Sequence, residues 1–273
     1  MRVIALLVAM VVCGAGLAFA QRGGGFRGFG GLLGAGAGNA PKRFPDADFV
    51  ACRLVYPEAR RYGAGWRTDY PLGERNLSIR FSEMTRTRVS KGPDGTPNHY
   101  LVRLTDEQLF QCPFLMAGDI SSIGLSSADA ERLRTYLLKG GFLWTDDQWG
   151  SEEWAVWLQE FSKVLDPKEY PMVDVPMTDP IFSAQFVLKE MPQIPNIQFW
   201  RSSHSTSEQG ADSAVPHLSA VRDHSGRIMV VSTHNTDIAD AFEREGEDPD
   251  YFYKFAPNGY ALGVNVILHA LTH

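Results

Sequence analysis

Polar side chains that could carry chemistry follow a short apolar run near the middle of the chain. Residues 142–145 form a brief β-favouring segment, and Asp146, Asp147, Gln148 and Trp149 come directly after it. In open α/β sheets, ligands bind outside the carboxyl ends of the strands. Carboxylates at such a place can accept hydrogen bonds, hold a hard cation, or act as an acid and a base. The stretch therefore predicts a binding site where a strand leaves the core.

Three other predicted strands, at 49–56, 114–117 and 227–232, are also followed by polar side chains. Because the carboxyl ends of parallel strands share one edge of a sheet, we expect these side chains to lie close together. The ligand-binding residues predicted for this edge are Trp66, Thr68, Asp69, Asp119, Asp146, Asp147, Gln148, Trp149, Asn235 and Asp237.

The candidate catalytic residues at this edge are Asp146, Asp147 and His234, but together they do not form a secure catalytic set. A divalent cation is an option, since several carboxylates could supply oxygen ligands, although no metal-ligand spacing is present. For each residue the alternative role is to cap a helix or brace a loop. The nucleophile motif G-x-S-x-G is absent, so covalent catalysis is not supported.

Alternating strand and helix patterns position these residues. Helical spacing of apolar residues predicts helices over 74–85, 126–139, 151–165 and 257–271, and a further helix beginning near Thr236. The segments 218–222 and 227–232 flank a polar turn and predict a hairpin. The proline-rich stretch 167–213 is predicted to be loops with a short strand at Phe199. The fold class is therefore α/β, with a mostly parallel central sheet covered on both faces.

The N-terminal residues predict export. Residues 1–20 carry one early basic residue, an apolar run and an A-x-A site, as in a cleaved signal peptide. A retained membrane anchor and lipidation at Cys13 are the alternatives. Residues 21–43 are rich in glycine and are interpreted as a flexible tether, and residues 44–273 as a single α/β domain. We expect a periplasmic or secreted protein with no membrane span after cleavage.

Charge and cysteine content limit the partners. The chain has 26 basic and 32 acidic residues, which argues against a nucleic-acid-binding protein. Cys52 and Cys112 could form a disulfide in an oxidising compartment. Two buried thiols are favoured instead, because a large core does not need a covalent link.

Five segments together resemble a known bacterial family. They are 67–71, 137–143 with Asp146 and Asp147, 179–182, 234–237 with 240–243, and 263–265 with 270–273. In this order they resemble the family called domain of unknown function 4159, over roughly residues 49–273. That family is similar in fold to class I glutamine amidotransferases, so the resemblance implies a flavodoxin-like three-layer sandwich. It implies no reaction, and the turn at Asp146 and Asp147 stands where an amidotransferase presents its cysteine.

These observations lead to three functional hypotheses. The first is an exported, non-catalytic domain that binds a small polar ligand or an envelope protein, and needs no cofactor. The second is a hydrolase using carboxylates and His234, with a divalent cation if it is metal-assisted. The third is a structural envelope protein.

Overall fold

The computed structural model describes residues 37–59 and 64–273. The predicted signal peptide and residues 21–36 of the predicted tether lie outside the described residues. Residues 37–39, which were expected to belong to the tether, form an edge strand instead. This strand pairs through its backbone with residues 99–101, and a glycine-rich segment can make such pairing without burying side chains.

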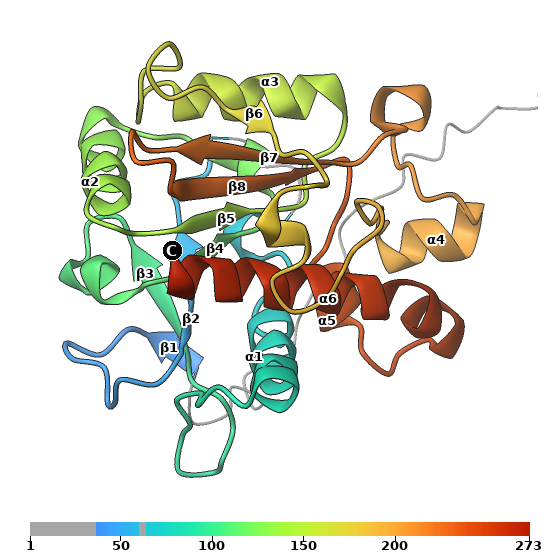
Figure 1. Ribbon diagram of the computed structural model, residues 1–273, viewed down its shortest axis with the longest axis horizontal. Helices are drawn as coiled ribbons and strands as arrows, with labels where there is room; N and C mark the ends of the chain where they lie inside the picture. The colour runs from blue at the N-terminus through green and yellow to red at the C-terminus, as the bar shows by residue number, and fades with distance from the viewer. Residues whose placement is uncertain (1–36, 60–63) are drawn as a thin grey trace, which may run out of the picture.

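An eight-stranded sheet forms the centre of the fold (Figure 1). Its strands are β1 (Ala37–Asn39), β2 (Ala51–Val55), β3 (His99–Arg103), β4 (Leu115–Ala117), β5 (Leu143–Thr145), β6 (Val173–Asp174), β7 (His217–Arg222) and β8 (Ile228–His234). Their order across the sheet is β1-β3-β2-β4-β5-β8-β7-β6. All neighbours pair in parallel except β7, which is antiparallel to both β6 and β8. The predicted parallel sheet and the hairpin are both confirmed.

Helices pack on both faces of this sheet (Figure 1). Within the described residues, the α-helices are α1 (Leu72–Thr85), α2 (Ser127–Leu138), α3 (Gly150–Phe161), α4 (Ile197–Ser203), α5 (Asp240–Glu243) and α6 (Pro249–Thr272). The 3-10 turns are η1 (Gly65–Arg67), η2 (Glu107–Gln111), η3 (Ile120–Ser122), η4 (Pro180–Phe182) and η5 (Gly210–Ser213). One core lies under α1, α5 and α6, and the other under α2 and α3.

The strands contribute to the two cores in alternation, because successive side chains of a strand point to opposite faces. In β5, Leu143 belongs to the core under α2 and α3, whereas Trp144 belongs to the core under α1 and α6. In β8, Val230 and Val231 divide in the same way. This alternation also decides to which face each polar residue at the ends of these strands points.

Local capping signals explain which helix boundaries the sequence predicts. Ser126 and Asp129 form a reciprocal capping box at the start of α2, as its sequence predicts. For α6, the prediction that the helix starts at Pro257 is wrong. The helix begins at Pro249, where Asp248 accepts hydrogen bonds from the backbone N–H groups of Asp250 and Tyr251, and Pro257 lies inside it. Proline is common at the first position of a helix. Of the two prolines, Pro249 is the one that directly follows the capping residue Asp248.

Two further element predictions are wrong. Phe199 lies in α4 rather than in a strand, because the side chain of Asn196 accepts hydrogen bonds from the N–H groups of Gln198 and Phe199 and so starts a helix. The helix predicted near Thr236 begins at Asp240. None of the described helices is both long and apolar enough to cross a membrane.

Cys52 and Cys112 are joined by a disulfide, so the expectation of two buried thiols is wrong. The two residues are 60 positions apart in sequence and their Cα atoms are 6.1 Å apart. Both cysteines are buried in the core under α2 and α3. The link connects the central strand β2 with the segment that leads into β4.

We predict that reduction of this disulfide destabilises the chain by about 2–4 kcal/mol, because a cross-link restricts the unfolded chain. Urea unfolding with and without a reductant measures the difference. The double variant Cys52→Ser, Cys112→Ser is the control, and its stability should not respond to the reductant. Finding two free thiols in the folded wild-type chain would contradict the structure.

Candidate functional site

Four loops meet at the carboxyl edge, defined here as the edge where β2, β4, β5 and β8 end. The N–H of Gly65, after β2, donates to Asp119 Oδ2, after β4, at 3.0 Å. The N–H of Asp146 donates to the carbonyl of Ala117 at 3.0 Å. The N–H of Asn235, after β8, donates to the carbonyl of Gln148, after β5, at 2.7 Å. The structure thus brings the polar loops together as the strand directions indicate.

The ten residues predicted to bind a ligand divide by exposure. Four are half-buried and can meet a ligand: Trp66, Thr68, Asp119 and Asp147. Six are buried: Asp69, Asp146, Gln148, Trp149, Asn235 and Asp237. The indole of Trp149 is only 2% exposed and donates to Asp147 Oδ1 at 3.0 Å, so it belongs to the interior and offers no open face. Arg67 stacks over the ring of Trp66 with 4.2 Å between its Cζ and the ring centroid.

Asp146 braces the carboxyl edge from within. Its Oδ1 accepts from the hydroxyl of Thr233, and its Oδ2 accepts from the N–H of Ala239 at 2.8 Å. One carboxylate thereby connects β5, β8 and the segment before α5. Burial raises the pKa of Asp146 to about 6, although the bonds from Thr233 and Ala239 oppose the shift. With both oxygens engaged, Asp146 has a structural role.

The side chains of Asn235 and Gln148 also make hydrogen bonds to the loops at this edge. Asn235 has a positive φ of 60°, and its Oδ1 accepts from the N–H of Gly150 at 2.8 Å. Its side-chain amide donates to the carbonyl of Val215 at 2.8 Å. Gln148 donates to the hydroxyl of Thr145 at 3.1 Å. These bonds hold the turns after β5 and β8 in place and so fix the half-buried residues around them.

His234 lies on the opposite face from Asp146. Its ring stacks on Trp154 of α3, with 4.6 Å between the centroids, and its Nε2 donates to the carbonyl of Gly150 at 3.0 Å. Burial lowers the pKa of His234 and favours the neutral ring. Since Thr233 points to Asp146, its neighbour His234 must point the other way. The candidate catalytic set Asp146, Asp147 and His234 is therefore not assembled around one reacting position.

A second group of carboxylates lies on the α1 and α5 face of the edge. Asp69, Asp240 and Glu243 each contribute one carboxylate oxygen, and these three oxygens lie within 4.8 Å of one another. Asp69 is 7% exposed and Asp240 is 1% exposed. Burial raises the pKa of Asp69, and the neighbouring carboxylates of Asp240 and Glu243 raise it further. This group, here called the carboxylate triad, could hold a hard cation through oxygen.

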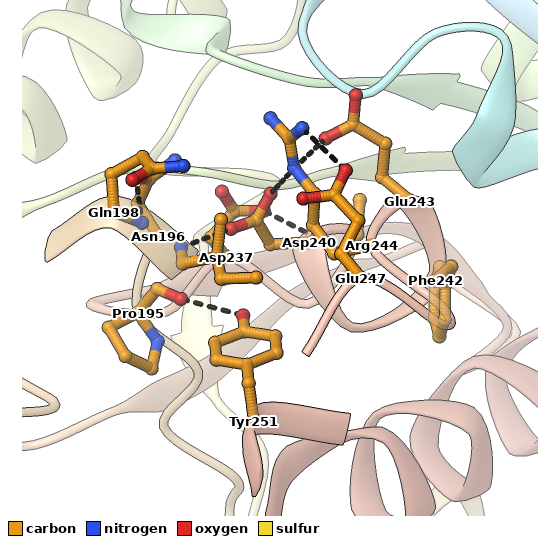
Figure 2. A network of polar contacts seen from close by, with 12 residues as sticks. Pro195, Asn196, Gln198, Asp237, Asp240, Phe242, Glu243, Arg244, Glu247 and Tyr251 are labelled. Carbon is orange, nitrogen blue, oxygen red and sulfur yellow. Dashed lines mark hydrogen bonds and ion pairs between the residues drawn. The ribbon is translucent and has the colours of Figure 1, made fainter. Parts of the chain in front are cut away.

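Arg244 pairs with two members of the triad, Asp240 and Glu243, as Figure 2 shows. Its Nε lies 2.8 Å from Glu243 Oε2 and 3.6 Å from Asp240 Oδ1, and its Nη1 lies 3.1 Å from Glu247 Oε1. Burial raises the pKa of Asp240 to about 8, although the charge of Arg244 opposes the shift. Nε of Arg244 makes no hydrogen bond within the described residues, so its attraction to Asp240 and Glu243 is that of an ion pair.

Arg53 and Glu74 form a buried ion pair beneath the same edge. Nε of Arg53 donates to Oε1 of Glu74 on α1, and both side chains are almost fully buried. A Cβ at Gly118 would lie 2.9 Å from Arg53 Nη1, so the glycine leaves room for the guanidinium. The pair is neutral as a whole, and its guanidinium lies beside Gly118, after β4.

The sequence-based prediction missed Asp240, Glu243, Arg53 and Glu74 as members of the edge. Asp240 and Glu243 are three positions apart on one helical turn, and this spacing is the signal that could have been used. Arg53 lies within a predicted strand, where a charged residue among apolar ones indicates a buried partner.

Two cavities lie away from the edge. One of about 420 Å³ lies between α1 and residues 89–97, and one of about 700 Å³ lies beside α2 and Lys163.

We predict that Glu74→Gln destabilises the chain by about 3–5 kcal/mol, because removing one partner of a buried ion pair leaves the other charge uncompensated. Glu83→Gln is the matched control on the same helix. Glu83 pairs with Arg80 at 2.8 Å at the surface, and its loss should cost about 0.5 kcal/mol or less. Equal losses of the free energy of unfolding for the two variants would contradict this account.

Asp146 should also make stability depend on pH. Its pKa is about 6 when folded, against a reference value of 3.8, so the folded chain retains the proton in this interval. The stability due to this proton is present below about pH 4 and is lost as pH rises through about 6. We expect the wild-type chain to lose about 2–3 kcal/mol more than Asp146→Asn between about pH 4 and pH 7. Urea unfolding measures this difference. If wild type and Asp146→Asn lost the same stability over this pH range, Asp146 would ionise with its ordinary pKa and the prediction would be contradicted.

Comparison with known proteins supports the resemblance read from the sequence. A family model described as domain of unknown function (DUF4159) matches residues 53–271. The match includes every described loop of the carboxyl edge and the carboxylate triad. A search of curated proteins finds no match to the chain. Because the family model covers most of the chain, this protein belongs to the DUF4159 family.

Proposed function

We propose that the chain is an exported binding domain that recognises a small polar ligand at the carboxyl edge and performs no covalent catalysis. The observation that carries the proposal is the arrangement of Trp66, Thr68, Asp119 and Asp147. These half-buried side chains come from the loops after β2, β4 and β5, and buried hydrogen bonds position those loops.

The strand order supports a particular place for the ligand. Numbered along the chain, the five strands β3-β2-β4-β5-β8 stand in the order second, first, third, fourth, fifth. This is the order of flavodoxin-like sheets, and it supports the proposed likeness to class I glutamine amidotransferases. In such sheets the ligand lies where the order reverses, which here is between β2 and β4. Thr68 and Gly118 are neighbours at this place, and Asp119 follows directly.

The absence of an activated nucleophile among the described edge residues supports binding over covalent catalysis. The turn after β5 presents Asp146, both of whose oxygens accept hydrogen bonds. Cys52 and Cys112 are joined in a disulfide and so cannot attack a substrate. His234 faces α3. The hydrolase alternative therefore gains no support from this geometry.

The charge of the edge and the disulfide support two further parts of the proposal. The half-buried carboxylates of Asp119 and Asp147 favour a ligand that carries hydroxyls or a positive charge. A disulfide is stable in oxidising compartments outside the cytosol, and the predicted signal peptide points to the same compartment. We therefore propose a periplasmic or secreted location.

A charge-matched set of ligands tests the proposal. We expect glucosamine to bind at least about tenfold more tightly than glucuronate, with glucose between them. A tenfold difference corresponds to about 1.4 kcal/mol, which is close to the contribution of one hydrogen bond to a charged group. Amide NMR shifts of the full chain measure such weak binding and show where it occurs. The shifts should cluster in residues 65–69, 118–119 and 146–149.

Asp119→Asn and Asp147→Asn should remove the preference for the amine while keeping a hydrogen-bond acceptor. Glu131→Gln, an exposed change on α2, is the control and should leave it unchanged. Equal shifts with all three sugars, or shifts confined to other surfaces, would contradict a ligand site at this edge and would favour a structural role in the envelope.

A further inference from the structure

The carboxylate triad contains buried oxygens that accept no hydrogen bond from the residues that the structure describes. Asp69 Oδ2 and Asp240 Oδ1 are buried and have no hydrogen-bond partner among the described residues. Leaving a buried polar atom unsatisfied is costly, and more so when the atom is charged. The two side chains come from different elements, since Asp69 precedes α1 and Asp240 opens α5.

Neighbouring contacts hold the two sides of the triad in position. The N–H of Gly73 donates to the carbonyl of Asp69 at 2.8 Å, and a Cβ at Gly73 would lie 3.4 Å from Cβ of Asp69. On the other side, Asp240 Oδ2 accepts from the N–H of Ile197 at 2.8 Å. The other oxygen, Asp240 Oδ1, accepts no hydrogen bond from the described residues and lies 3.6 Å from Arg244 Nε. Backbone bonds therefore hold the main chain at Asp69 and the carboxylate of Asp240.

The charge around the triad favours a divalent ion. When all three carboxylates are ionised, they and the guanidinium of Arg244 carry a net charge of about −2, so one divalent cation can cancel this charge in place of the protons that burial favours. Glu247 also pairs with Arg244 and is more exposed to solvent. In Figure 2, Arg244 lies beside Asp240, Glu243 and Glu247. The arginine thus compensates only part of the buried negative charge.

We propose that Asp69, Asp240 and Glu243 bind a hard divalent cation. All three supply carboxylate oxygen, and neither a histidine nor a cysteine belongs to the described group, so Ca²⁺ and Mg²⁺ suit it better than softer metals. Ligand oxygens lie about 2.3–2.6 Å from Ca²⁺, so two of them can be up to about 5 Å apart. The oxygens of the triad, within 4.8 Å of one another, meet that condition. Water completes the coordination.

The cation site shares the loop after β2 with the switch point, since Asp69 directly follows Thr68, but the proposal does not depend on the organic ligand proposed there. Titration of the chelator-treated full chain with CaCl₂ or MgCl₂ alone tests it by calorimetry. We expect saturable binding at one site, tighter for Ca²⁺, and an increase in the melting temperature. Failure of the sugar titration would leave this result unaffected, so the two proposals can fail independently.

Asp69→Asn and Asp240→Asn should each weaken Ca²⁺ binding at least tenfold. Each variant removes a like charge from a crowded buried group, so it should melt in chelator at or above the wild-type temperature, which shows that it folds. Glu247→Gln is the matched control, because Glu247 contacts the same arginine but lies outside the triad, and its affinity should stay within about threefold of wild type. The proposal is overturned if wild type binds neither ion saturably, if Asp69→Asn binds Ca²⁺ like wild type, or if Glu247→Gln loses binding as strongly as the triad variants.

Discussion

An excess of buried negative charge at the carboxyl edge is the constraint on which the rest of the site depends. Asp69, Asp146, Asp237 and Asp240 are all at most 7% exposed, and burial raises the pKa of each. The buried cation Arg53 is shared with Glu74. Such a group is stable only when protons, hydrogen-bond donors or an added cation compensate its charge. The fold supplies donors to Asp146, whereas oxygens of Asp69 and Asp240 remain without one among the described residues.

The alternation of side chains along β8 divides this edge into two different environments. Thr233 points to Asp146 and the carboxylates, while His234 points to Trp154 under α3. A histidine beside a carboxylate cluster in sequence is therefore kept away from it in space. This division separates the acidic face from the only histidine proposed for catalysis, and it is why the geometry supports binding rather than acid–base chemistry.

The sequence predicts what depends on local signals and fails where distant partners decide. Ser126 and Asp129 mark the start of α2 because a capping box is a local interaction. The strand-end loops could be assigned to one edge because parallel strands require it. The link between Cys52 and Cys112 depends on the distance between segments 60 residues apart, which no local pattern reveals. The same holds for the triad, whose members Asp69 and Asp240 come together only in the folded chain.

The central claim is that this edge buries more carboxylates than its donors and cations can compensate. Carboxyl carbon NMR of the metal-free chain, followed across pH, tests it most directly because it reports the ionisation of each side chain. The account predicts that at least one carboxyl group of the edge keeps its proton to about pH 6 or above, against about 3.9 for an exposed aspartate. If every carboxyl group of the edge titrated near that reference value, the edge would not hold uncompensated charge and the account would be contradicted.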